Sequence, residues 1–205
     1  IKENKTLQGM LKTISHRTKD VIAAGETDRQ RWEDPRQLEA AWNERARLAA
    51  AFIPRGAAVL DLGCGAMALE RHLPHGCRYL PCDLAPRDER TVVCDFNAGE
   101  FPADVACDVV TVLGVLEYLF DPPAFLAKLR ALGRPVVMSY WVADGRGPAD
   151  RRANGWVNDL TQAQLMQTLE AAGFGRVTSR EINPGQLLMR AEPAADHTPA
   201  ARSVW

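Results

Sequence analysis

Residues 59–70 read Val-Leu-Asp-Leu-Gly-Cys-Gly-Ala-Met-Ala-Leu-Glu, and this stretch decides the fold of the chain. The apolar run that ends at Asp61 has the length and composition of a buried parallel strand. Gly63 and Gly65 then allow the backbone to turn sharply and to approach a ligand closely. A helix over residues 66–73 would point its free N–H groups at the same place. The stretch therefore predicts a strand, a ligand-binding turn and a helix.

Two classes of cofactor use a turn of this kind. The spacing of Gly63, Gly65 and Ala68 fits the dinucleotide fingerprint. However, Asp61 takes a place that is normally apolar in a dinucleotide loop, and its carboxylate would repel a pyrophosphate. The same carboxylate can accept hydrogen bonds from a cationic amine. An NAD(P)-dependent oxidoreductase is therefore the less favoured alternative.

Residues 59–65 resemble the first motif of the class I S-adenosylmethionine-dependent methyltransferases of small-molecule type, with Met67 in the place of the family's third glycine. The resemblance extends over residues 38–191. It implies S-adenosyl-L-methionine as the cofactor and S-adenosyl-L-homocysteine as the product. It also implies that four residues of the motif lie against the cofactor, namely Asp61, Gly63, Cys64 and Gly65.

Acidic residues end the next two expected strands. Residues 78–83 form the second strand, and Asp83 at its tip, with Leu84 beside it, is placed to accept both hydroxyls of a ribose. Residues 91–97 form the third strand, and the resemblance places Asp95 and Phe96 at the adenine ring. Three acids at three successive strand ends indicate one shared site.

The fourth expected strand, residues 107–114, is apolar, rich in β-branched residues and ends at a glycine. The resemblance implies that Leu113 and Gly114 border the methionine end of the cofactor and that the following residues line the methyl-transfer channel. Tyr118 stands where many small-molecule methyltransferases carry histidine. A general base is optional, because proximity and orientation can supply roughly 7 to 11 kcal/mol of the barrier reduction. The candidate catalytic residues are Glu117, Tyr118 and Tyr140.

A helix is predicted from Pro35 to Ile53, because apolar residues recur there at spacings of three and four. In the resembling family the helix before the first strand often closes over the cofactor. Trp42 and Arg45 are then expected to contact it, with the guanidinium on the methionine carboxylate. The alternative is that this helix face only covers the sheet.

The remaining elements complete an α/β pattern. Helices are expected at residues 122–132 and 161–172, the latter with Asn158 or Asp159 as its N-cap. Strands are expected at residues 134–140, 176–182 and 186–191. The alternation predicts a Rossmann-like doubly wound sheet. The resemblance adds seven strands in the order 3-2-1-4-5-7-6, with the last strand antiparallel and the ligand at the carboxyl ends of the strands.

Residues 140–156 are too long for a plain turn, and long loops at a ligand edge usually carry function. We expect this segment to form the wall of an acceptor pocket, and its arginines suggest an acceptor with a carboxylate or phosphate. The alternative is a surface loop with solvated arginines. The candidate substrate residues are Trp141, Arg151, Arg152 and Trp156.

The 205 residues carry 25 basic and 26 acidic side chains. This length supports one sizeable core, which we assign to residues 29–193. Because the charges nearly cancel, a nucleic-acid partner is not favoured. Residues 1–28 are expected to form a polar arm that packs on a partner or stays mobile, with at most a short helix near residues 7–14, and residues 194–205 a tail.

Five cysteines lie on or beside the expected strands without the spacing of a metal site, which predicts reduced thiols, no bound metal and a cytoplasmic location. We expect no membrane span, since no apolar run reaches about 18 residues. His72 and His75 are expected on the surface. The cysteines are Cys64, Cys77, Cys82, Cys94 and Cys107.

The function predicted from the sequence is methyl transfer from S-adenosylmethionine to a small-molecule, sugar or lipid-linked acceptor. A non-catalytic S-adenosylmethionine-binding scaffold or regulatory domain is the alternative, favoured by Met67 and by the absence of histidine at Tyr118. The sequence leaves open the acceptor, the atom that is methylated and the oligomeric state.

Overall fold

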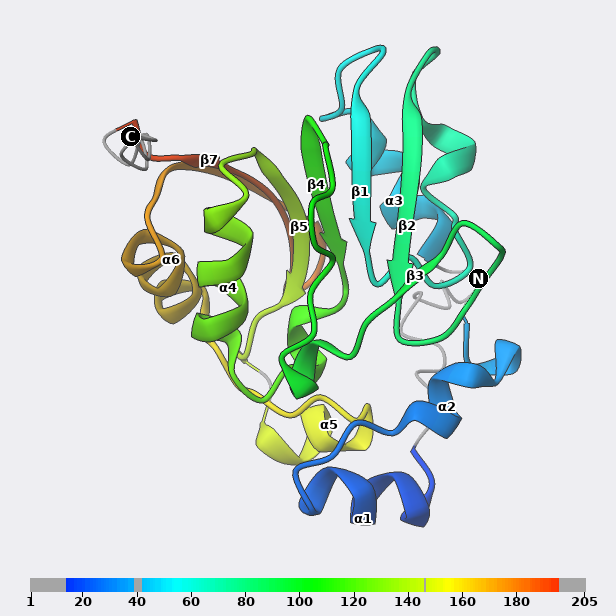
Figure 1. Cartoon of the computed structure of the whole chain (residues 1–205). Coiled ribbons are helices and arrows are strands. Elements are labelled where there is room, and N and C mark those ends of the chain that lie inside the picture. The colour runs from blue at the N-terminus through cyan, green and yellow to red at the C-terminus, as the bar shows by residue number, and fades with distance from the viewer. Residues whose placement is uncertain (1–13, 39–41, 146, 196–205) are drawn as a thin grey trace, which may run out of the picture.

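The structure, a computed structural model, describes residues 14–38, 42–145 and 147–195. Its centre is a seven-stranded sheet in the order β3-β2-β1-β4-β5-β7-β6 (Figure 1). β7 is antiparallel to both of its neighbours, and the other pairs are parallel. The predicted fold class and strand order are confirmed. The strands are β1 Ala58–Leu62, β2 Arg78–Asp83, β3 Val92–Val93, β4 Val109–Leu113, β5 Val136–Trp141, β6 Phe174–Asn183 and β7 Gln186–Pro193.

Helices lie on both faces of the sheet and along one of its edges. The α-helices are α1 His16–Ala23, α2 Arg29–Glu33, α3 Trp42–Ala50, α4 Pro122–Ala131, α5 Pro148–Ala153 and α6 Gln162–Ala171. The short 3₁₀ turns are η1 Pro35–Gln37, η2 Glu70–His72, η3 Phe96–Ala98 and η4 Leu116–Tyr118.

Two apolar cores form because neighbouring residues of a strand point to opposite faces. In β1, Leu60 and Leu62 pack into the core that includes α4 and α6, whereas Val59 packs into the core that includes α3. All five residues of β1 and of β4 are buried. The central parallel strands are therefore covered on both faces, as their continuous apolar composition predicts.

The carboxyl ends of β1, β2 and β4 meet at one edge of the sheet. The register pairs Leu62 with Cys82 on β2 and with Val112 on β4. Figure 1 shows α1, α2 and α5 gathered along the same edge. This arrangement places the strand tips, with their acidic residues, next to helices from two distant parts of the chain.

The two helices predicted around the first strand are shorter than expected. The helix predicted over residues 35–53 is interrupted, because Leu38 has extended backbone after η1 and the regular helix is α3. The helix predicted over residues 66–73 is reduced to η2. Met67 has a φ of 51°, a left-handed conformation that a right-handed helix cannot include.

Other boundaries also differ from the sequence prediction. The third strand is limited to β3, since η3 follows at once. Thr161, rather than Asn158 or Asp159, caps α6, and it forms a capping box with Gln164. The short helix α5 inside the long loop was not predicted.

The N-terminal segment, which we define as residues 14–38, folds onto the rest of the chain. Ile14 donates its backbone N–H to the carbonyl of Ala153 at 3.1 Å. Thr27 donates its hydroxyl to Asp95 at 2.9 Å. The expectation of an arm that packs on a partner or stays mobile is therefore corrected for residues 14–28. The short helix predicted near residues 7–14 lies almost wholly outside the described residues, as does most of the predicted tail.

Within the described ranges, no helix combines the length and apolarity needed to cross a membrane.

Candidate functional site

A cavity of about 320 Å³, which we call the main cavity, lies at the carboxyl edge of the sheet. The tips of β1, β2 and β4 and the residues after β3 form its floor, and the N-terminal segment contributes to its walls. All twelve predicted cofactor residues border it: Trp42, Arg45, Asp61, Gly63, Cys64, Gly65, Asp83, Leu84, Asp95, Phe96, Leu113 and Gly114.

The glycine turn after β1 is held against β2. Gly63 and Cys64 donate their N–H groups to the carbonyl of Cys82 at 2.8 and 3.1 Å, and Gly65 donates to Asp83 Oδ2 at 2.7 Å. A Cβ at Gly63 would collide with the side chain of Val115. These N–H groups are bonded within the protein, so the turn supplies close backbone approach rather than the free donors expected from the sequence.

Asp61 is buried at the tip of β1 and borders the main cavity. Its carboxylate accepts hydrogen bonds from the hydroxyls of Thr111 and Tyr79, both at 2.6 Å. Burial raises the pKa of Asp61 to about 6, although both hydrogen bonds oppose the rise. Asp61 therefore changes its protonation state a little below neutral pH. A cation in the cavity would stabilise its charged form.

Asp83 is buried at the tip of β2 and has three partners within the protein. Besides the N–H of Gly65, it accepts from Arg87 at 3.0 Å and from the backbone of Ala85 at 3.4 Å. A carboxylate offers about four acceptor positions. Asp83 thus retains capacity for a ligand hydroxyl.

The residues after β3 form the adenine side of the predicted site. Asp95 accepts the hydroxyl of Thr27 at 2.9 Å and the N–H of Asn97 at 3.0 Å. The ring of Phe96 packs at 5.2 Å, centroid to centroid, on Phe125 of α4. Asp95 therefore connects the floor of the cavity to the N-terminal segment.

Arg45 and Trp42 project from α3 toward the end of β4. The guanidinium of Arg45 occupies the space that a Cβ at Gly114 would take, and its Cζ lies 5.5 Å from the centroid of the Trp42 ring. Only glycine at this position allows the guanidinium so close to the strand tip. The arrangement places a positive charge where the sequence analysis expects the methionine carboxylate.

A second cavity of about 40 Å³, the smaller cavity, adjoins the main one. Arg31, Trp32, Trp42, Arg45, Gly114 and Tyr118 border both cavities. The other residues that border the smaller cavity are Gln37, Glu117, Trp141, Asn154 and Trp156.

Tyr118 lies at the junction of the two cavities. Its hydroxyl accepts the indole N–H of Trp156 at 3.2 Å, and its ring meets Trp32 edge to face at 4.9 Å. Burial raises the pKa of the Tyr118 phenol. Because the phenol stays neutral near pH 7, it can donate a hydrogen bond but is a poor general base.

Glu117 is buried, and its two carboxyl oxygens differ. Oε1 accepts the backbone N–H of Trp141 at 2.9 Å, whereas Oε2 is buried without a hydrogen-bond partner among the described residues. Burial raises the pKa of Glu117. A carboxylate with a raised pKa is better suited to accept a proton near neutral pH. Of the three predicted catalytic residues, Glu117 fits the role of proton acceptor best.

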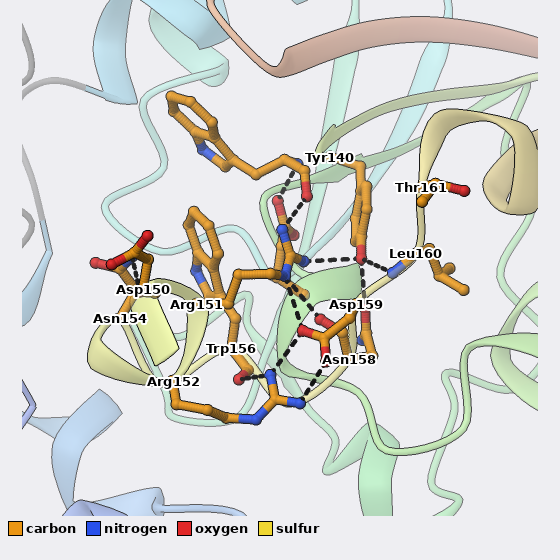
Figure 2. Close-up of polar contacts among 12 residues, drawn as sticks. Tyr140, Asp150, Arg151, Arg152, Asn154, Trp156, Asn158, Asp159, Leu160 and Thr161 are labelled. Carbon is orange, nitrogen blue, oxygen red and sulfur yellow. Dashed lines mark hydrogen bonds and ion pairs between the residues drawn. The ribbon is translucent and has the colours of Figure 1, made fainter. Parts of the chain in front are cut away.

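Tyr140, the third predicted catalytic residue, lies in a polar network outside both cavities (Figure 2). Its hydroxyl donates to Asn158 at 2.5 Å and accepts from the backbone of Leu160 at 3.1 Å and from Arg151 at 2.9 Å. Burial raises the pKa of Tyr140 to about 12. The structure therefore places Tyr140 in contacts within the protein and outside both cavities, whereas the sequence analysis expected it at the substrate.

Arg151 is the centre of this network. Its side chain is completely buried. Besides Tyr140, it donates to the carbonyl of Trp141 at 2.6 Å, to that of Asn158 at 3.0 Å and to Asp159 at 3.1 Å. All three nitrogens of Arg151 thus bond to protein groups outside both cavities, whereas the sequence analysis expected Arg151 to bind a substrate anion.

The other predicted substrate residues divide in the same way. Arg152 pairs with Asp159 at 2.8 Å and borders neither cavity. Trp141 and Trp156 stack with their ring centroids 5.9 Å apart and border the smaller cavity. The long loop therefore contributes aromatic rings to the site, while Arg151 and Arg152 bond within the protein.

Several residues of the site were not predicted. The N-terminal segment supplies Arg31 and Trp32, and the loops after β1 and β2 supply Arg71 and Arg87. The one available sequence signal was the position of Arg87, four residues after the acid at the tip of β2. Nothing in the polar composition of residues 14–38 indicates that they cover a cavity.

Comparison with known families agrees with this site. A family model described as a methyltransferase domain matches residues 33–179. No curated protein matches the chain.

Solved structures share the fold at low sequence identity. CalO1, a methyltransferase of calicheamicin biosynthesis solved with S-adenosylhomocysteine, is 18% identical with a TM-score of 0.63, over 91% of this chain and 69% of its own. Human N-acetylserotonin methyltransferase, solved with S-adenosylmethionine, is 18% identical with a TM-score of 0.61, over 87% and 66%. A Haloferax volcanii protein described as a methyltransferase, solved with the Trm112 activator, is 18% identical with a TM-score of 0.61, over 88% and 99%.

The sequence motif, the strand order and the family match lead to the same assignment. The structures establish only the fold, because their identity to this chain is low. The family model, however, covers more than half of the residues. The chain therefore belongs to the methyltransferase-domain family and has the class I Rossmann-like fold of that family.

Proposed function

We propose that this chain binds S-adenosylmethionine in the main cavity and transfers its methyl group to a small-molecule acceptor in the smaller cavity. The observation that carries this proposal is the meeting of Asp61, Asp83 and Asp95 at one cavity, on three successive strand tips. This order of acids, with a glycine turn after the first, matches the chemistry of an adenosine bearing a cationic amino acid.

The residues of the main cavity fit each part of that cofactor. Asp83 has acceptor capacity for the ribose hydroxyls, and Asp95 and the half-buried Phe96 border the cavity where the adenine is expected. Asp61 can accept hydrogen bonds from the ammonium group. Arg45, stacked near Trp42, can pair with the carboxylate. A dinucleotide would instead bring a pyrophosphate toward the buried carboxylate of Asp61.

The acceptor is assigned to the smaller cavity because it adjoins the main cavity at Gly114 and Tyr118, where the methionine end is expected. Four tryptophans border it, so an apolar or planar group is favoured. Arg31 lies 4.5 Å above the Trp32 ring, and no described carboxylate forms an ion pair with it. An anionic group on the acceptor therefore suits Arg31 rather than Arg151 or Arg152.

The chemistry supplied by the cofactor is a methyl group made electrophilic by a positively charged sulfur. The protein's main task is to hold the acceptor atom in line with that methyl group and to exclude water. Tyr118 can donate a hydrogen bond that orients the acceptor. Glu117 can accept the proton that the acceptor loses.

Titration calorimetry with S-adenosylhomocysteine tests the proposal, with NAD and NADP as parallel ligands. Micromolar binding of S-adenosylhomocysteine alone is expected, and it would justify an acceptor screen with a radiolabelled methyl donor. Binding of a dinucleotide instead would overturn the proposal. Cofactor binding without turnover on any acceptor would favour a non-catalytic binding module.

A further inference from the structure

Arg87 is a buried arginine in the loop after β2, and the sequence analysis assigned it no role. Thr91 accepts the backbone N–H groups of Arg87 and Asp88, both at 3.1 Å, and so folds the loop back toward the strand tip. The side chain of Arg87 is only 9% exposed. It borders the main cavity together with Asp83.

The donors of the Arg87 guanidinium are not equivalent. Nη2 donates to Asp83 at 3.0 Å. Nε is buried and has no hydrogen-bond partner among the described residues. A buried N–H of a charged group without a partner is costly, and such groups usually mark a missing ligand or water. The structure thus places an unused donor beside the acid that is expected to bind ribose.

A ribose hydroxyl needs both kinds of partner, because it has one proton to donate and two lone pairs that accept. Asp83 can only accept, and Arg87 can only donate. We propose that Arg87 is a second ribose-binding residue, whose Nε–H donates to a hydroxyl oxygen while Asp83 accepts the hydroxyl protons. This inference rests on the proposed function, because it assumes an adenosine-containing ligand in the main cavity.

A simpler role for Arg87 would be to neutralise the buried charge of Asp83. Lysine could then replace it, since an ammonium group carries the same charge. A ribose-binding role depends instead on the position of Nε and on the planar geometry of the guanidinium, which lysine lacks. The two roles therefore predict different results for Arg87→Lys.

The experiment measures the affinity of the full chain for S-adenosylhomocysteine and for its 2′-deoxy and 3′-deoxy analogues by calorimetry. The variants are Arg87→Met and Arg87→Lys. Arg90→Met is the matched control, because Arg90 lies in the same loop but pairs at 2.6 Å with both Glu70 and Asp88 and does not border the cavity. Thermal melting confirms that each variant is folded.

In the wild type, loss of at least one hydroxyl is expected to weaken binding about tenfold or more. In both Arg87 variants, the loss of affinity caused by removing that hydroxyl should be at least about threefold smaller, because the hydroxyl has already lost the Nε–H as its partner. Arg90→Met keeps the full penalty. If Arg87→Lys still binds S-adenosylhomocysteine and loses as much affinity for the deoxy analogues as the wild type does, the inference is overturned while the proposed function stands. If the wild type fails to bind S-adenosylhomocysteine, the proposed function falls and the inference with it.

Discussion

The carboxyl edge of the sheet and the segment from β5 to α6 both gather charged side chains, but they use these side chains differently. At the sheet edge, Asp61, Asp83 and Asp95 keep acceptor capacity and face the main cavity. In the segment after β5, Arg151 has its donors bonded to protein groups and faces neither cavity (Figure 2). Whether a charged residue can bind a ligand thus depends on whether other protein groups already occupy its hydrogen-bonding positions.

Replacement of Arg151 should have the largest effect, and it should act on stability. Arg151→Met removes the donors bonded to the carbonyls of Trp141 and Asn158 and one of the two arginines that pair with Asp159. The free energy of unfolding should therefore fall by about 3 kcal/mol or more. Urea unfolding measures this loss. Arg152→Met, whose arginine is 43% exposed, is the matched control and should cost less than about 1 kcal/mol. If Arg151→Met instead loses little stability but no longer binds the acceptor, Arg151 would be a substrate-binding residue and not a structural one.

Replacement of Asp83 should act on binding instead. Asp83→Ala removes hydrogen bonds to a charged group and should weaken S-adenosylhomocysteine binding by about 1.5 to 3 kcal/mol. Asp108→Ala is the control, because Asp108 accepts the N–H of Ala58 at 2.8 Å at the opposite edge of the sheet. Unchanged affinity in a folded Asp83→Ala protein would place the ribose elsewhere.

Replacement of Arg45 should weaken only those ligands that carry the amino-acid carboxylate. Arg45→Met should weaken S-adenosylhomocysteine about tenfold, the size expected for a lost charge-assisted hydrogen bond. The same change should leave the affinity for 5′-methylthioadenosine unaltered, since that ligand lacks the amino-acid carboxylate. Calorimetry with both ligands measures the difference. Equal losses for the two ligands would show that Arg45 does not contact the carboxylate.

The smallest expected effect is a dependence of binding on pH. The pKa of Asp61 is about 6 in the free protein, and an ammonium group prefers its charged form, so affinity should fall as pH drops below 6. Between pH 7 and pH 5 the loss should be about three- to tenfold. Titrations at several pH values measure it. Asp61→Asn should bind more weakly throughout and lose this dependence, whereas a retained dependence would assign the proton to another group.

The sequence predicted the cofactor edge better than the acceptor side. The acids at the tips of β1 and β2 were assigned correctly to one cavity because parallel strands in a doubly wound sheet end at the same edge. Arg151 and Tyr140, which the sequence analysis placed at the reaction site, lie outside both cavities. A long loop rich in arginine and tryptophan does not show which side chains will find partners within the protein. The helix predicted after the glycine turn is reduced to η2 for a local reason, because Met67 has a left-handed backbone.

The sequence by itself determined the glycine turn and the positions of the acids, because these depend on local patterns and on the fact that parallel strands end at one edge of the sheet. The strand order followed from the family resemblance of residues 59–65. Only the tertiary structure decided that the N-terminal segment borders the main cavity, that Arg31 and Arg87 face it and that Arg151 does not. The physical reason is that burial and hydrogen-bond satisfaction depend on residues far apart in the chain. Asn154, for example, accepts a hydrogen bond from Arg31 at 3.4 Å across 123 positions of sequence.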